Sequence, residues 1–286
     1  MLYSYVIIKT EIKTIFYYSI NMDIIQQLPF PDEICHKIVL YAFKSPHTHL
    51  QEEIFKRVVP THIYQKLVEK GGIEKVNGYI TKVCVWDYGD EQLLDDDDLK
   101  SLQFDIKVLQ GLQNLTEFHL MYTGVTWDIQ VLQGLPHLTK FDLSETGVTG
   151  DIQFLQGLPN LTEFNLNYTR VFGDIKVLQG LQHLTVFHLD MTGVTGDIQV
   201  LQGFHNLTEF HLDGTGVTGY IKVLQGFRNL TEFSLGGTGV TGDIKFLQGL
   251  QHLTTFYLYS TDVFGDEEAF HEYRKSRGLE ECVVMR

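Results

Sequence analysis

The amino-acid sequence predicts an α/β solenoid, with a parallel β-sheet on one side and short helical or 3₁₀ segments on the other. The first observation is a period of 23 residues, repeated seven times without a gap over residues 104–264. Fixed periods of this length are typical of solenoids, in which each unit stacks on its neighbours. The second observation is a Leu-Thr-x-Phe-x-Leu segment in every unit, which alternates apolar and polar residues as a half-buried strand does. The units begin at Phe104, Trp127, Gly150, Gly173, Gly196, Gly219 and Gly242.

The second half of each unit is predicted to form a turn and then one short helical turn. In the fifth unit the turn is Gly214-Thr215-Gly216, and the apolar residues then follow at intervals of three or four: Val217, Ile221, Leu224 and Phe227. The aspartate of the Gly-Asp pair before this segment is expected to cap free N–H groups. One threonine recurs where each strand turns inward, from Thr123 to Thr261. Its hydroxyl is expected to donate to a carbonyl of the adjacent unit.

The strand spacing continues beyond both ends of the array. Residues 78–103 are predicted to contain an N-terminal strand at Ile80–Val85, followed by an acidic insertion. Residues 265–286 are predicted to form a C-terminal cap, with a helix over Asp266–Ser276 and a strand over Leu279–Val284. With one strand in each repeat, the sequence predicts nine strands.

The pattern LxxLxLxxT-x-V-x-G-D-I resembles the leucine-rich repeat family, with Phe at the second Leu position and Thr at the usual Asn position. Its spacing is similar to the plant-specific and internalin-like classes, which differ from it by one residue. The resemblance implies a leucine-rich repeat solenoid with a curved parallel sheet. It also implies that the concave strand face of this solenoid binds proteins.

Residues 22–77 lack the repeat and are predicted to form a small helical N-terminal unit, behind an apolar and unstructured extension over residues 1–21. The segment from Phe30 to Tyr41 (FPDEI…KI…Y) resembles the opening of an F-box, a family that joins substrate receptors to a ubiquitin ligase. The resemblance implies a substrate adaptor that docks a ligase subunit through residues 28–70 and uses the repeats as the substrate receptor. A helical cap that shields the first strand explains the same residues. Both interpretations stay open.

The composition indicates which class of partner and which cellular compartment to expect. The net charge of −14 disfavours nucleic acid and favours a basic protein or peptide as the partner. No run reaches the roughly 18 apolar residues of a membrane span, and residues 1–21 lack the order of a signal peptide. The three cysteines, Cys35, Cys84 and Cys282, form no CxxC pair, which favours a reducing compartment. A cytoplasmic or nuclear protein is therefore expected.

Neither an enzyme nor a cofactor is predicted, because no nucleophile set, phosphate loop or pair of carboxylates in a cleft is recognisable. The pairs His188-x-Asp190 and His211-x-Asp213 fall on adjacent strands and carry atoms that zinc accepts. A flat, exposed sheet is expected to offer no surrounding groups that would fix them. The sequence therefore predicts no metal site.

The outward strand positions vary between the units while the inward positions hardly change. This contrast predicts a partner-binding surface on the strand face, although drift at solvated positions would produce the same variation. Tyrosines on that face are expected to anchor a partner, and its carboxylates to attract a basic one. The predicted contact residues are His119, Tyr122, Asp142, Glu145, Asn165, Tyr168, His188, Asp190, His211, Asp213, Tyr257 and Tyr259.

Overall fold

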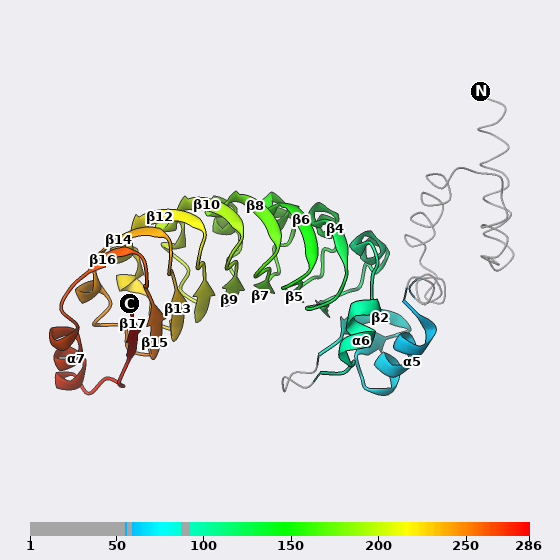
Figure 1. Cartoon of the computed structure of the whole chain (residues 1–286), viewed down its shortest axis with the longest axis horizontal. Coiled ribbons are helices and arrows are strands. Elements are labelled where there is room, and N and C mark those ends of the chain that lie inside the picture. Colours follow the sequence, from blue (N-terminus) through cyan, green and yellow to red (C-terminus); the bar gives the residue numbers. More distant parts are fainter. Residues whose placement is uncertain (1–54, 56–58, 87–91) are drawn as a thin grey trace, which may run out of the picture.

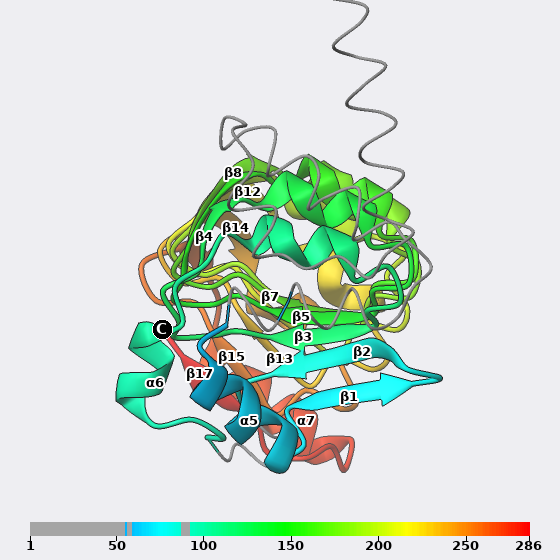
Figure 2. The ribbon, with the colours of Figure 1, turned by 90° about the vertical axis from the view of Figure 1, so that its right-hand side faces the viewer.

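The structure, a computed structural model, describes residue 55, residues 59–86 and residues 92–286. These residues form a curved solenoid, with a ten-stranded sheet along the inner side of the arch (Figure 1). Seen from its end, the coil has three sides: this sheet, a seven-stranded sheet and a row of 3₁₀ helices (Figure 2). The predicted α/β solenoid with a curved parallel sheet is confirmed.

The ten-stranded sheet contains nine parallel strands in register, as predicted, so that Phe118 pairs with Phe141 and each later unit repeats the pairing. The last strand lies at Val283–Met285 instead of the predicted Leu279–Val284, because the N–H of Leu279 still bonds to the carbonyl of Arg274 at the helix end, at 3.0 Å. One further strand, β1 (Ile73–Val76), pairs antiparallel with β2 (Tyr79–Cys84) through a turn at Asn77 and Gly78. The parallel strands are β2 (Tyr79–Cys84), β3 (Glu117–His119), β5 (Lys140–Asp142), β7 (Glu163–Asn165), β9 (Val186–His188), β11 (Glu209–His211), β13 (Glu232–Ser234), β15 (Thr255–Tyr257) and β17 (Val283–Met285).

The second sheet was not predicted. It arises from the Gly-Val-Thr-Gly-Asp segments, for which the sequence analysis expected a turn and a helical turn. That expectation is wrong because Val148 is buried between exposed neighbours, Gly147 and Thr149, which is the alternation of a strand. The seven strands are β4 (Thr126–Asp128), β6 (Gly147–Asp151), β8 (Arg170–Asp174), β10 (Gly193–Asp197), β12 (Gly216–Tyr220), β14 (Gly239–Asp243) and β16 (Asp262–Phe264).

The helical part of each unit begins only after this strand, and it is a 3₁₀ helix. The predicted aspartate caps are present: Asp151, for example, accepts a hydrogen bond from the backbone N–H of Gln153 at 2.9 Å. Tyr220 replaces the aspartate in one unit and provides no such cap. The helices are η1 (Ile106–Gly111), η2 (Ile129–Gly134), η3 (Ile152–Gly157), η4 (Ile175–Gly180), η5 (Ile198–Leu201), η6 (Ile221–Gly226) and η7 (Ile244–Phe246).

The core is a continuous column, because every unit places the same side chains at the same depth. The central phenylalanine of each strand is at most 2% exposed, and successive rings stack with centroids 5.4–5.8 Å apart. A single unit could not cover both faces of its own ring layer, so stacking supplies the missing contacts. These residues are Phe118, Phe141, Phe164, Phe187, Phe210, Phe233 and Phe256.

Two sets of threonines form different hydrogen bonds. The hydroxyl of Thr123 donates to the carbonyl of Leu120 at 2.6 Å, within its own unit, and its equivalents do the same through Thr261. The predicted bond to the adjacent unit is therefore wrong, since the inward turn brings this hydroxyl back to its own strand. The threonine before each strand links the units instead: Thr139 donates to the carbonyl of Thr116 at 2.9 Å, and equivalent bonds span every step to Thr254.

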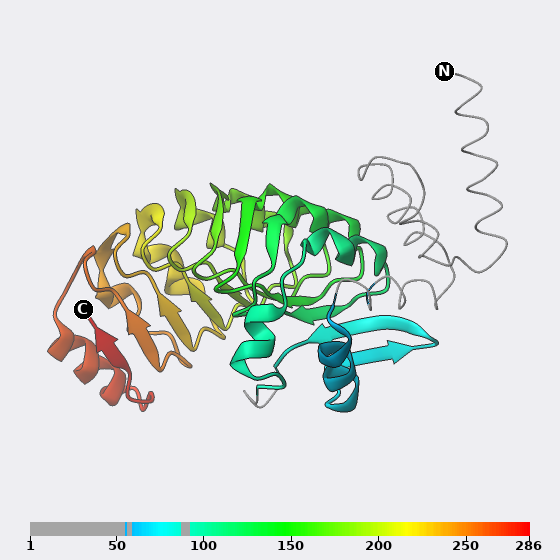
Figure 3. The same ribbon diagram turned by 45° about the vertical axis from the view of Figure 1, so that its right-hand side comes forward.

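Helices cover both ends of the array (Figure 3). Helix α5 (Thr61–Glu69) lies with β1 and β2 at one end, and α7 (Glu267–Ser276) lies at the other, where a helix was predicted. The described part of the acidic insertion forms α6 (Asp96–Ser101), capped by Asp95. The F-box-like segment from Phe30 to Tyr41 lies outside the described residues. Among the residues that are described, no helix is long and apolar enough to cross a membrane.

Candidate binding face

Three rows of outward side chains cross the concave face: two from alternate positions of the strands, and a last row from the residues two positions beyond the strand ends. The first row is Glu117, Lys140, Glu163, Val186, Glu209, Glu232 and Thr255. The middle row is His119, Asp142, Asn165, His188, His211, Ser234 and Tyr257. The last row is Met121, Ser144, Asn167, Asp190, Asp213, Gly236 and Tyr259. Because β-strands alternate sides, these residues face away from the phenylalanine column.

A fourth set of residues, here called the edge row, follows the last row immediately. Its backbones are left-handed, with φ between 54° and 65°. Tyr122, Tyr168 and Met191 in this row are 46%, 58% and 56% exposed. Tyr122 and Tyr168 were predicted to lie on the strand face, whereas they lie in the turn at its edge. The edge row is Tyr122, Glu145, Tyr168, Met191, Gly214, Gly237 and Ser260.

The carboxylates of the last row hold the backbone of neighbouring strands. Asp190 Oδ1 accepts from the N–H of Asp213 at 2.7 Å, and Asp213 Oδ1 accepts from the N–H of Gly236 at 2.6 Å. Asn167 Oδ1 accepts in the same way from the N–H of Asp190 at 2.6 Å. Asp213 also accepts from the hydroxyl of Ser234. These side chains satisfy N–H groups that would otherwise be unpaired on the sheet, so their first role is structural.

Charge on the first row is mixed rather than purely acidic. Lys140 pairs with Glu163 at 2.6 Å. Lys82 on β2 is only 7% exposed and lies 3.2 Å from Glu74. The remaining carboxylates, including the exposed Glu145, keep the rest of the face negative.

A histidine cluster lies in the middle of the face, on β9, β11 and β13. The rings of His188 and His211 stack with centroids 4.3 Å apart. His188 Nε2 lies 2.9 Å from Glu209 Oε1, and His211 Nε2 lies 3.6 Å from Glu209 Oε1 and 3.4 Å from Glu232 Oε1. His211 Nε2 is buried and has no hydrogen-bond partner. Burial, and then the neighbouring His188, lowers the pKa of His211, which favours the neutral imidazole.

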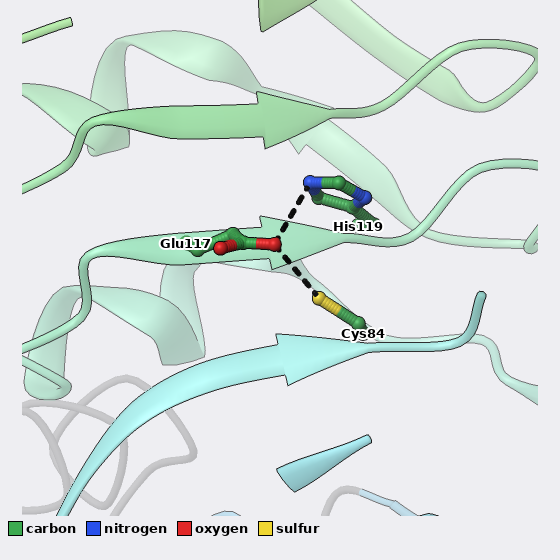
Figure 4. Close-up of side chains that lie close together, drawn as sticks. All are labelled: Cys84, Glu117 and His119. Carbon is green, nitrogen blue, oxygen red and sulfur yellow. Dashed lines mark hydrogen bonds and ion pairs between the residues drawn. The ribbon is translucent and has the colours of Figure 1, made fainter. Parts of the chain in front are cut away.

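A second cluster joins β2 to β3 (Figure 4). The carboxylate of Glu117 lies between the thiol of Cys84 and the ring of His119, with Oε1 3.8 Å from Sγ and 3.4 Å from Nε2. Cys84 is 1% exposed, and burial raises the pKa of its thiol far above the ordinary value. A buried, protonated thiol is a poor nucleophile.

No protein-family model matches this chain, and no curated protein matches it in sequence. Solved structures do match its fold. An internalin from Listeria monocytogenes has a TM-score of 0.50 at 21% identity, over 72% of this chain and 85% of the internalin. A plant ice-binding protein has a TM-score of 0.55 at 22% identity, over 67% of this chain and 61% of that protein. The leucine-rich repeat ectodomain of a membrane receptor kinase from Arabidopsis thaliana has a TM-score of 0.53 at 17% identity, over 67% of this chain and 28% of the ectodomain.

The chain has a leucine-rich repeat fold. The structure brings some of the predicted contact residues of this leucine-rich repeat face together and keeps others apart. Asn165 donates to Asp142 at 3.0 Å, and His188 stacks on His211. His119, by contrast, lies three strands away from His188. Tyr257 and Tyr259 are on the last repeat, far along the arch from Tyr122.

Glu209, the carboxylate that contacts both histidines, was not among the predicted contact residues. The sequence pattern paired the histidines with Asp190 and Asp213 instead, but both aspartates lie two residues beyond the strand ends and accept backbone N–H groups. The available signal was the register itself: a glutamate two residues before a histidine lies diagonally across from the histidine of the previous repeat. The same reasoning finds Glu117 beside Cys84.

Proposed function

We propose that this chain is a non-enzymatic interaction module that binds a protein or peptide on its concave face and edge row. The observation that carries this proposal is the conformation of the edge row. Tyr122 and Tyr168 have φ of 59° and 56°, a region that costs most side chains roughly 1–2 kcal/mol and that glycine adopts freely. Gly214 and Gly237 occupy the same turn in later repeats, so the fold does not require a large residue there. A partner that contacts these exposed aromatic side chains would explain why they are present at positions where the backbone conformation is unfavourable for them.

The type of side chain supports the same proposal. Tyrosine rings offer large, stiff contact areas, which are enriched at the centres of protein interfaces. Glu145 lies between Tyr122 and Tyr168 in the edge row and is exposed. An arginine or lysine of a partner can pair with this carboxylate while its side chain lies over a tyrosine face. The partner we propose is therefore a basic peptide or a basic surface of a protein.

The fold is suited to such a role. The Arabidopsis receptor-kinase ectodomain, which shares it, was solved in complex with Casparian strip integrity factor 2. That complex belongs to the kinase, and its partner is not assigned to this chain. It supports the proposal only in that a solenoid of this shape presents a long surface to another molecule.

A random-peptide display library, panned against the full chain, tests the proposal. We expect enrichment of peptides with lysine or arginine beside an aromatic residue. Their binding should be lost with the double variant Tyr122→Ser/Tyr168→Ser. It should be retained with Phe172→Ser, which removes a 50% exposed aromatic residue from the second sheet. Peptides that bind the edge-row variant as well as the wild type, or no enrichment at all, would contradict a site on this row.

The ubiquitin-ligase adaptor is the second hypothesis for this chain. Most of residues 28–70 lie outside the described residues, and the described ones favour the cap. Val59, Ile63 and Leu67 are at most 1% exposed, and Phe55 packs edge-on against Phe104 of the first repeat at 6.4 Å. Purified ligase scaffold subunit mixed with the full chain separates the two hypotheses. A stable complex would support the adaptor hypothesis. If no complex forms, the end-cap hypothesis is favoured.

A further inference from the structure

The histidine cluster on β9, β11 and β13 has the geometry of a metal-binding site. One donor atom from each of His188, Glu209 and His211 lies within 4.8 Å of the others. Zinc binds histidine nitrogen and carboxylate oxygen at about 2.0–2.1 Å, so the ligand atoms of a tetrahedral ion are about 3.3 Å apart. The measured separations of 2.9, 3.6 and 3.4 Å to the two glutamates are close to that value. Small side-chain rotations would bring these atoms around one ion.

His211 is oriented for this role by a carboxylate on its other side. Its Nδ1 lies 3.7 Å from Asp190 Oδ2, and Asp190 is itself fixed by Asn167 Nδ2 at 3.1 Å and by the N–H of Asp213. A carboxylate next to Nδ1 favours the proton on that nitrogen, which leaves the Nε2 lone pair free for a metal. That Nε2 points toward the two glutamates, is buried, and has no hydrogen-bond partner. Buried polar atoms are rarely left unsatisfied, so this nitrogen is available to bind a metal ion.

We propose that His188, Glu209 and His211 bind one divalent transition-metal ion on the concave face, and that Glu232, which lies 3.4 Å from His211 Nε2, adds its negative charge beside them. Two imidazoles with carboxylates suit zinc better than calcium or magnesium, which prefer all-oxygen sites. The surrounding charge favours a cation as well, because Asp190 and Asp213 lie beside the cluster. Among the described residues, no lysine or arginine forms an ion pair with any of these four carboxylates.

The Cys84 cluster is the weaker of the two candidates. Its donor atoms also lie within 4.8 Å of one another. Lys82, however, pairs with Glu117 in the sheet register and acts electrostatically on both Glu117 and Cys84. A fixed positive charge next to the donors opposes a second cation. In a zinc titration, substitutions in the histidine cluster should therefore weaken binding, and a substitution of Cys84 should not.

Zinc titration of the full, metal-stripped chain, followed by calorimetry or by competition with a chromogenic chelator, tests the site. We expect one ion per chain in the wild type and a loss of affinity on the order of 100-fold in His188→Gln and in His211→Gln. Asp190→Asn should weaken binding by about 10-fold or more, since it removes the group that orients His211. Cys84→Ser and the exposed His205→Gln are the matched controls, and both should bind zinc as the wild type does.

Cobalt provides a second readout that does not depend on affinity. Cobalt bound at this site should show no thiolate charge-transfer absorption, because all its ligands are nitrogen and oxygen. Each variant is compared with the wild type by circular dichroism, so that a loss of fold is not scored as a loss of metal. The proposal is overturned if the wild type binds no zinc, if the histidine variants bind it unchanged, or if Cys84→Ser abolishes binding.

Discussion

The phenol of Tyr259 lies over Gly236 and donates a hydrogen bond to Asp213 Oδ2 at 2.7 Å, across 46 residues of sequence and one intervening repeat. A methyl group at Gly236 would overlap the ring of Tyr259. Because Gly236 in the sixth repeat has no side chain, Tyr259 in the seventh repeat can reach Asp213 in the fifth. The acceptor raises the pKa of Tyr259 to about 12.

We predict that Gly236→Ala breaks this contact and lowers the pKa of Tyr259 toward the ordinary value of about 10. In the wild type the raised pKa means that the contact stabilises the fold below pH 10 and that this contribution is lost as pH rises through about 12. Ultraviolet difference titration against Tyr259→Phe measures the shift. Gly226→Ala, where an added methyl group meets nothing within 4 Å, is the control and should leave the titration unchanged.

Phe187→Ala should lower the free energy of unfolding by about 3–5 kcal/mol. The ring is fully buried and stacks on Phe164 at 5.8 Å and on Phe210 at 5.6 Å, so its removal leaves a gap in the middle of the column. The exposed His183→Ala, in the same repeat, should change it by no more than about 0.5 kcal/mol. Urea melts of the two variants compare them directly. Equal stabilities would show that the column does not hold the repeats together.

Arg274→Leu should destabilise the chain by about 3 kcal/mol. Arg274 is 2% exposed, and its guanidinium donates to the carbonyls of Leu250 at 2.6 Å, Leu253 at 2.7 Å and Glu280 at 3.0 Å. Its loss leaves the buried carbonyls of Leu250 and Leu253 in the last repeat without this donor and frees the segment that precedes β17. Arg277→Leu, one turn later on the exposed side of the helix end, should have little effect in the same thermal melts. If Arg274→Leu melts close to the wild-type temperature, water donates hydrogen bonds to these carbonyls in place of the guanidinium.

Replacing a carboxylate by lysine should affect stability in the last row and partner association in the edge row. Asp213 accepts hydrogen bonds from Ser234, Gly236 and Tyr259, so a lysine at this position would remove all three. We therefore predict that Asp213→Lys lowers the melting temperature.

Glu145→Lys, at an exposed edge position, should leave the melting temperature unchanged and slow the association of a basic peptide several-fold at low salt. The difference from the wild type should shrink as ionic strength rises, because salt screens exposed charges. Stopped-flow association rates at two salt concentrations measure it. Equal rates at low salt would remove Glu145 from the binding surface.

Periodicity predicted the architecture because it reports which side chains face the core. The inward phenylalanines and the nine parallel strands follow from alternation alone. The second sheet was missed because its five central strands bury only one valine each and its two end strands bury none, which is too short a signal to separate from a helical turn. Strand β1 carried a usable signal in Asn77-Gly78, the dipeptide of a tight hairpin turn.

The side-chain contacts between repeats were harder to predict than the strands. They join residues on different repeats, and they depend on which way each side chain turns. The bond of Arg274 to three carbonyls and the contact of Glu209 with two histidines both need a known stacking register. The strained edge-row backbones could not be read from residue type, because tyrosine and methionine are not the residues expected at positive φ.

The variant Tyr168→Gly tests the central claim most directly, because stability and binding should change in opposite directions. Tyr168 is 58% exposed with φ of 56°, so glycine relieves the backbone cost and removes the contact surface. We predict a melting temperature equal to or above that of the wild type. The dissociation constant of a display-selected basic peptide should rise about 10-fold or more, as expected for loss of an anchor. A variant that binds the peptide as tightly as the wild type would contradict the edge row as the binding site.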